Sequence, residues 1–264
     1  MRIGFFDSGV GGVSVLTEAM EMIPGQEWFF DADVDHVPYG EKSAEEITRY
    51  AEDNTRFLLA QGVDAIVVAC NTATAVAIRN LRAITEIPVI GMEPAVKPAV
   101  EGPGNGRILV AATPVTLREA KLKDLIRRVD SLHRVDLLPL PELVLLAEQE
   151  KFDSDEARRC IEKAFAGIDP AQYSALVLGC THFIYFTPLF RRLLGPEIRL
   201  VDGNEGTVRR LADVLHLPMH TSFPAPGGSP EIHWYQSGRP VTGEDRIAYF
   251  ARLRDRIKKI KNFE

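Results

Sequence analysis

Short apolar runs alternate with longer amphipathic segments along the chain. The short runs are rich in β-branched and aliphatic residues, which is typical of strands buried in a parallel sheet, and the longer segments carry apolar residues at helical spacing. This order predicts an α/β fold with mainly parallel sheets and helical crossovers. The predicted strands are Ile3–Phe6, Trp28–Phe30, Ala65–Ala69, Val89–Gly91, Ile108–Ala111, Ala175–Gly179 and Ile198–Val201. The predicted helices are Val13–Met22, Ser43–Ala60, Ala73–Ile84, Thr116–Arg128, Asp153–Ala166, Pro188–Leu194 and Glu205–Leu215.

A glycine-rich stretch at 101–106 divides the chain, and the order of strand endings then recurs. Thr113 follows a strand as Asp7 does, and Cys180 follows a strand as Cys70 does. This loose repeat predicts two pseudo-symmetric α/β lobes whose strand carboxyl ends face one crevice, where small ligands bind. We expect residues 1–95 plus 207–264 to form the first lobe and residues 96–206 the second.

Two of the three cysteines, Cys70 and Cys180, stand at the carboxyl ends of predicted buried strands. Parallel strands deliver side chains into a crevice at that end. A cysteine is often only a small buried hydrophobe, and this interpretation stays open for each alone. Polar neighbours favour a site instead, because they are poor core residues unless hydrogen-bonded. These neighbours are Asn71 and Thr72 after the first cysteine, and Thr181 and His182 after the second.

Zinc ligation lacks its usual cysteine and histidine spacing, so no metal is expected. A disulfide is disfavoured because the chain starts directly on a predicted strand and not on a signal peptide, which indicates reduced thiols in the cytoplasm. A protonated imidazole lowers the pKa of a neighbouring thiol. His182, which is more often structural when alone, is therefore a candidate partner for a Cys180 thiolate.

The loop Asp7–Gly12 joins a predicted strand to a predicted helix, where backbone amides can approach an anion. It has neither the dinucleotide nor the Walker glycine spacing. Asp7 would repel a phosphate, so an amino group or a base role is the better hypothesis, with helix capping as the alternative.

Composition narrows the class of partner. The chain has 264 residues, 45% hydrophobic and 26% charged, with a net charge of −6. The basic run at 252–261 is interleaved with Leu253 and Ile257 at helical spacing, which indicates a solvated helix face more than a nucleic-acid patch. No apolar stretch approaches the ~20 residues that span a bilayer. We expect neither nucleic acid nor membrane as a partner.

The chain resembles the glutamate racemases, the cofactor-independent members of the aspartate/glutamate racemase superfamily, over nearly its whole length. The stretches that carry the resemblance are Ile3–Gly12, Val37–Gly40, Ala69–Ala73, Val89–Pro94 and Leu178–Phe183. It implies two α/β lobes with the site between them, no cofactor, a homodimer, and glutamate as a small-molecule substrate. It also implies that the enzyme supplies D-glutamate for peptidoglycan.

Racemisation without a cofactor needs a base and an acid on opposite faces of the substrate, and donors that stabilise the carbanion. The resemblance assigns Cys70 to the D-enantiomer and Cys180 to the L-enantiomer, with Asp7 and His182 assisting. The implied substrate contacts are Ser8, Tyr39, Gly40, Asn71, Thr72, Thr116 and Thr181. Asp33 and Glu148 match supporting acids, although Glu142 competes for the second match.

Several positions depart from the family pattern, and they leave the preference between glutamate and aspartate open. They include His36, Met92, Glu119 and Ile184. The alternatives are an aspartate or broader amino-acid racemase, and a relative that binds amino acids without turnover. A nucleotide-binding module is a more distant alternative that rests on the glycine loop.

Overall fold

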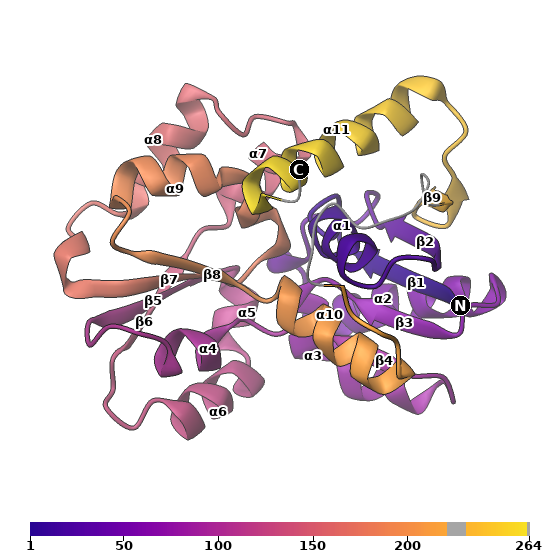
Figure 1. Ribbon diagram of the computed structural model, residues 1–264, viewed down its shortest axis with the longest axis horizontal. Helices are drawn as coiled ribbons and strands as arrows, with labels where there is room; N and C mark the ends of the chain where they lie inside the picture. The colour runs from indigo at the N-terminus through magenta and orange to yellow at the C-terminus, as the bar shows by residue number, and fades with distance from the viewer. Residues whose placement is uncertain (221–230, 263–264) are drawn as a thin grey trace.

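The computed structural model describes residues 1–220 and 231–262 and contains two separate sheets (Figure 1). The first has six strands in the order β10-β9-β2-β1-β3-β4, and the second has four in the order β6-β5-β7-β8. Every pairing is parallel except that of β9 with β10. The α/β class with two lobes is thus confirmed. The strands are β1 (Arg2–Asp7), β2 (Glu27–Ala32), β3 (Ala65–Val68), β4 (Val89–Gly91), β5 (Arg107–Ala112), β6 (Val135–Pro139), β7 (Tyr173–Leu178), β8 (Arg199–Asp202), β9 (Ile232–Gln236) and β10 (Arg239–Pro240).

In the lobe of the six-stranded sheet, hereafter lobe 1, strand alternation sends side chains to two helix layers. Phe5 packs in the apolar cluster with α1, and Phe6 packs on the other face with α2 and α3. Ser43 caps α2, and its capping box includes Glu46. The helices of this lobe are α1 (Val13–Met22), η1 (Tyr39–Glu41), α2 (Ala44–Ala60), α3 (Asn71–Ala83), α10 (Asn204–Leu215) and α11 (Glu244–Lys261).

The four-stranded sheet forms lobe 2, with α4 and α6 on one face and α8 and α9 on the other (Figure 1). Val110 faces the first pair, and its neighbours Leu109 and Ala111 face the second. The helices are α4 (Val96–Glu101), α5 (Pro114–Arg118), α6 (Ala120–Val129), α7 (Glu142–Glu148), α8 (Asp155–Ala164), η2 (Pro170–Gln172), η3 (Thr181–Phe186) and α9 (Thr187–Leu194). Among the described residues, no helix has the length and apolarity that crossing a bilayer requires.

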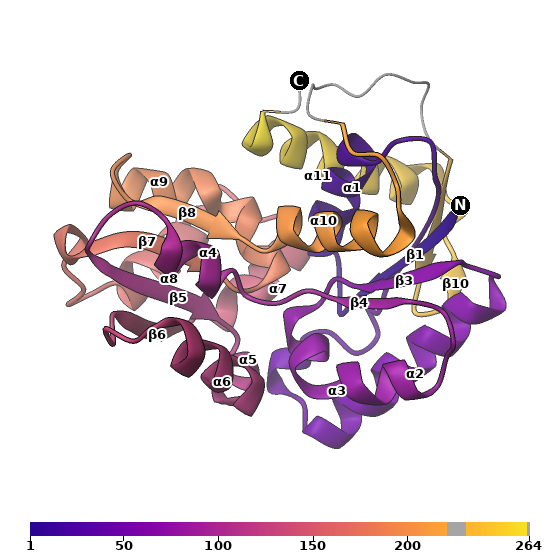
Figure 2. The same ribbon diagram turned by 60° about the horizontal axis from the view of Figure 1, so that its bottom comes forward.

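The C-terminal segment joins the two lobes. Strand β9 pairs with β2, and α11 then runs from lobe 1 towards lobe 2, where it contacts η3 (Figures 1 and 2). Ion pairs from α11 reach acids of lobe 2, namely Arg252 to Glu150, Arg256 to Asp153 and Lys261 to Asp202. The lobe boundaries at residues 95 and 207 stay a prediction, and 221–230 and 263–264 lie outside the described residues.

The predicted helix Thr116–Arg128 is wrong as a single element. The chain forms α5 and α6 instead, separated by Glu119, whose backbone is extended (φ −65°, ψ 140°). Pro114 begins α5 two residues earlier than predicted, and proline is favoured at that position. The sequence did not predict β6, β9, β10, α4 or α7, and it indicated only the 252–261 part of α11. Strands β6 and β10 lie at sheet edges, and α4 and α7 are short.

Candidate active site

Cys70 lies where β3 ends and α3 begins, and only 4% of it is exposed. The Ala73 amide donates to its Sγ over 3.4 Å, and the thiol donates to Ser8 Oγ over 3.7 Å. Burial raises the pKa of Cys70, and the negative charges of Asp7 and Cys180 raise it further. Burial and the negative neighbours thus favour the protonated thiol, whereas the helix amino terminus beside Cys70 favours the thiolate.

Cys180 follows β7 in lobe 2, and its Sγ lies 3.7 Å from Nδ1 of His182. His182 is 1% exposed, and burial alone would lower its pKa. Its contacts with Cys180 and Glu148 outweigh burial and raise the pKa of His182 well above 6.5. The imidazole is thus held as a cation, placed to stabilise negative charge on the Cys180 sulfur.

Glu148 ends α7 and connects this histidine to lobe 1. Its Oε1 accepts from Nε2 of His182 at 2.7 Å and from the amide of Val10 at 2.8 Å. Glu142, at the start of the same helix, is exposed. Of the two glutamates that the sequence leaves in competition, the structure places Glu148 in the site, in contact with the histidine beside Cys180.

Asp7 is fully buried at the end of β1, and burial raises its pKa while the charge of His182 opposes that rise. Its Oδ2 accepts from the Gly12 amide at 3.0 Å, so it does bind the turn before α1. Its carboxylate also accepts from Thr181 Oγ1 of lobe 2 at 3.3 Å. Asp7 therefore accepts hydrogen bonds both from the turn before α1 and from lobe 2. The residue of this loop that contacts the Cys70 thiol is Ser8.

Two glycines allow the loop after β1 to press against lobe 2. A Cβ on Gly9 would collide with the carboxylate of Glu148. One on Gly11 would collide with Thr181 Oγ1 and lie 2.6 Å from Nδ1 of His182. At Gly11 the added Cβ would also lie 2.8 Å from the backbone nitrogen of His182, so the close approach of the lobes requires glycine there. At Gly9 a Cβ would displace the Glu148 carboxylate from its present contacts.

Three threonine hydroxyls form a triangle between the lobes. Thr72 Oγ1 lies 3.0 Å from that of Thr113 and 3.1 Å from that of Thr116, and the last two are 3.0 Å apart. Thr113 also faces Gly40, where an added Cβ would come within 2.8 Å of it. Thr72, Thr116 and Gly40 are among the site residues predicted from the sequence, and Thr113 is not. Its position after a strand, equivalent to that of Asp7, was the available signal.

Asn71 is 3% exposed, and both its side-chain nitrogen and its oxygen lack a partner within the described residues. Buried amides are rarely left unpaired, so this side chain is available to a ligand. The hydroxyl of Tyr39, in contrast to the Asn71 amide, already has a partner, because it donates to Asp33 Oδ2 at 2.6 Å. Asp33 also accepts a hydrogen bond from Ser237 and is hydrogen-bonded to Nδ1 of His36. It therefore fixes the position of Tyr39 and of the Tyr39–Gly40 segment.

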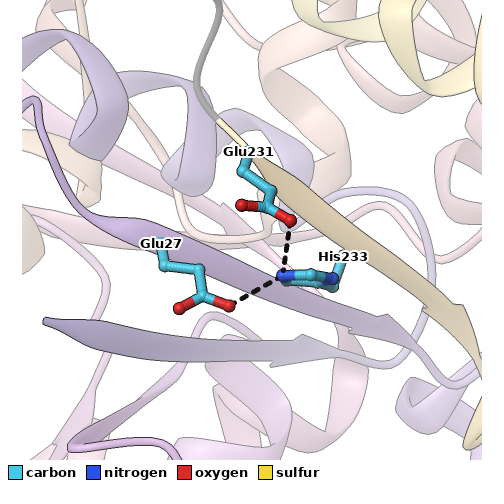
Figure 3. A group of neighbouring side chains, drawn as sticks. All are labelled: Glu27, Glu231 and His233. Atoms are coloured by element: carbon cyan, nitrogen blue, oxygen red, sulfur yellow. Dashed lines mark hydrogen bonds and ion pairs between the residues drawn. The ribbon is translucent and has the colours of Figure 1, made fainter.

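One group of described side chains has metal-ligating atoms within 4.8 Å of one another, namely Glu27, Glu231 and His233. Figure 3 shows one ring nitrogen of His233 directed at both carboxylates. This Nε2 lies 2.9 Å from Oε1 of Glu27 and 3.6 Å from Oε1 of Glu231. Glu27 is also paired with Arg2 at 3.2 Å. These contacts account for the group, which joins β9 to β2 and includes none of the residues around the thiols.

Residues 18–211 match the model of the Asp/Glu/Hydantoin racemase family, and the chain belongs to this family. It is similar to glutamate racemase of Campylobacter curvus, with 44% identity over 98% of both chains. Glutamate racemase 2 of Bacillus subtilis is 40% identical over 96% of this chain and 95% of its own. The fold is similar to the crystal structure of Escherichia coli glutamate racemase with L-glutamate and the activator UDP-MurNAc-ala. That match has a TM-score of 0.82, 28% identity, and 97% and 94% coverage of the two chains.

Proposed function

We propose that the chain is a glutamate racemase that interconverts L- and D-glutamate with two cysteines and no cofactor. The observation that carries the proposal is the pair of buried cysteines, Cys70 from lobe 1 and Cys180 from lobe 2. Ser8 contacts the first thiol and His182 the second, and the hydrogen bond from Thr181 to Asp7 joins these two groups across the lobes. The relatives that cover nearly the full chain and are named glutamate racemases support the substrate.

In each direction of the reaction, one proton moves from the substrate to one sulfur and another moves from the other sulfur to the substrate. With D-glutamate, the Cys70 thiolate takes the α-proton, and the electron pair of the broken C–H bond remains on the substrate as a carbanion. The thiol of Cys180 then protonates the opposite face, which leaves Cys70 as thiol and Cys180 as thiolate. L-Glutamate reacts from this second state and restores the first.

The surrounding residues have distinct proposed roles. The His182 cation stabilises the Cys180 thiolate, and Glu148 holds that cation in place. Asp7 assists Cys70, and its raised pKa allows it to carry a proton. The substrate carboxylates are bound by hydroxyls, the free amide of Asn71 and the amino terminus of α3. The proposed contacts are Ser8, Tyr39, Gly40, Asn71, Thr72, Thr116 and Thr181.

Incubation of the purified protein with L-glutamate in deuterated water tests the function. We expect loss of optical rotation together with deuterium at the α-carbon. Cys70→Ala and Cys180→Ala should each abolish racemisation, whereas Cys160→Ala should not, because this half-buried cysteine lies on α8. Absence of α-exchange in the wild-type protein would contradict the proposal. Faster turnover of aspartate than of glutamate would correct the substrate.

The cellular role is also part of the proposal. D-Glutamate made by this enzyme would enter peptidoglycan, and the enzyme would act in the cytoplasm as a homodimer. Rescue of a D-glutamate auxotroph by the wild-type gene, but not by the Cys70→Ala variant, tests the first point. Light scattering of the purified protein tests the dimer. Activity that survives chelators and carbonyl reagents tests the absence of metal and pyridoxal phosphate.

A further inference from the structure

Both backbone polar groups of Val10, in the middle of the loop after β1, are bound by side chains of lobe 2. Its amide donates to Oε1 of Glu148 at 2.8 Å, and its carbonyl accepts from the hydroxyl of Tyr185 at 3.2 Å. The same loop carries Asp7 and Ser8, and Ser8 is the hydrogen-bond partner of Cys70. The conformation of the loop at one thiol is thus fixed by two side chains of the opposite lobe.

Tyr185 is itself held rigidly. It is fully buried in η3, and its ring stacks on Phe152 with centroids 4.8 Å apart. Arg256 of α11 donates to the carbonyl of Tyr185 at 2.9 Å and pairs with Asp153 at 2.7 Å. The guanidinium also lies over the ring of Phe152. The hydroxyl therefore reaches Val10 from a fixed point.

We propose that Tyr185 is a positioning residue for racemisation, which holds the Asp7–Gly12 loop closed over Cys70 through the carbonyl of Val10. The proposal concerns the same site and rests on the proposed function for its kinetic part. The Val10 carbonyl also accepts from the amide of Val13 at 3.1 Å, at the start of α1. Loss of the Tyr185 hydroxyl therefore leaves the carbonyl with its local donor only and removes the hydrogen bond that ties it to lobe 2, so the loop can move away from that lobe. Because burial raises the pKa of Tyr185 well above its ordinary value, the hydroxyl remains a donor at every pH where the enzyme works.

Tyr185→Phe removes the hydroxyl and keeps the ring packing. We expect kcat to fall about tenfold in both directions, with KM changed less than about threefold, because a small displacement of catalytic groups slows chemistry more than binding. Tyr249→Phe is the matched control. Tyr249 is also a buried tyrosine at the lobe contact and donates weakly to the Glu148 carbonyl over 3.5 Å, but it does not bind the loop.

A second readout is independent of turnover. Cys70 is 4% exposed, so its alkylation by iodoacetamide requires the loop to open. Mass spectrometry gives its rate relative to that of Cys160 in the same sample, which serves as the internal reference. We expect Tyr185→Phe to raise this ratio at least about fivefold, following the loss of one buried hydrogen bond, and Tyr249→Phe to leave it unchanged.

An alkylation ratio equal to that of the wild type overturns the proposal whatever happens to kcat. A lower melting temperature with unchanged kcat and ratio also overturns it, because the role is then only structural, and so does an equal effect in Tyr249→Phe. A wild-type protein that does not racemise glutamate contradicts the proposed function, and the alkylation ratio alone then decides the role of Tyr185. If Tyr185→Phe does not fold, Arg256→Gln replaces it, with a smaller rise expected and an unchanged ratio contradicting the proposal.

Discussion

One carboxylate oxygen of Glu148 lies 2.7 Å from Nε2 of His182, although the two residues come from different elements of lobe 2. The imidazole is buried, and an uncompensated buried charge is strongly destabilising. The Cys180 sulfur and the Glu148 carboxylate together make a histidine cation tolerable here, because both raise the pKa of His182. The protonation state of this histidine therefore depends in part on Glu148, a residue that contacts the imidazole and not the sulfur.

Glu148→Gln tests this relationship. The substitution removes the negative charge, so the pKa of His182 should fall from its raised value and the cation should be lost at lower pH. We expect the alkaline limb of the pH profile of kcat/KM for L-glutamate to move to lower pH, with a loss of about 10- to 100-fold at pH 8. Glu142→Gln on the same helix is the control, because Glu142 is exposed. Coincident profiles for the wild type and Glu148→Gln would show that the carboxylate does not set this charge.

Thr113→Val tests the residue that the sequence analysis missed. Valine keeps the shape and removes the hydroxyl that bonds Thr72 and Thr116. We expect KM for both enantiomers to rise about 5- to 20-fold, consistent with loss of one or two hydrogen bonds in a binding site. Steady-state kinetics in both directions measures this. Thr207→Val removes a buried hydroxyl that bonds the Gly203 carbonyl in α10, so it should leave KM unchanged. Equal KM values in Thr113→Val and the wild type would place the triangle outside the binding site.

The strand endings were predictable from sequence because buried parallel strands have a strong local signature. Strand β4 matches its predicted bounds, and β3 delivers Cys70 as expected. The edge strand β6 was not predicted, since its half-exposed residues include Asp136 among apolar ones. Strand β9 is intermediate in burial throughout and pairs with β2, which is about 200 residues earlier in the chain. No local pattern encodes such a pairing.

The site residues also divide into those that the local sequence predicts and those that depend on tertiary packing. The identity of Cys70, Cys180 and His182 was visible because each follows a predicted strand. The grouping of Glu148 with Val10 was not visible, because it depends on how α7 packs against the loop of the other lobe. The same is true of Asp7, whose hydrogen bond to Thr181 crosses between the lobes. Contacts between lobes depend on tertiary packing, which residue spacing does not reveal.

Gly11→Ala tests whether the lobes must approach this closely. The new Cβ would lie 2.8 Å from the amide nitrogen of His182, a backbone atom that cannot move alone. We expect kcat/KM to fall at least about 100-fold, because misplacement by about 1 Å has effects of this size. Circular dichroism should still show a folded protein. Gly243→Ala is the control, since nothing lies within 4 Å of its added Cβ. Activity within threefold of wild type in Gly11→Ala would mean that the lobes tolerate a wider separation.

Asp31 gives a prediction for stability as a function of pH. It is 1% exposed at the carboxyl half of β2, and burial raises its pKa from 3.8 to about 6, with a partly compensating hydrogen bond from the Gly238 amide. The folded protein thus binds this proton more tightly than the unfolded chain. The stabilisation is fully present below pH 3.8 and is lost as the pH rises through about 6.

Asp31→Asn should therefore raise the free energy of unfolding at pH 8 by up to about 3 kcal/mol and change it little at pH 3.5, because the amide oxygen still accepts from Gly238. Urea unfolding at the two pH values measures the difference. Asp35→Asn is the matched control with the opposite sign, since the hydrogen bond with Arg239 lowers the pKa of that exposed carboxylate. Asp35→Asn should therefore reduce the free energy of unfolding at pH 8. A lower stability of Asp31→Asn than of the wild type at pH 8 would contradict this prediction. It would mean that the hydrogen bond from Gly238 stabilises the ionised carboxylate by more than burial destabilises it.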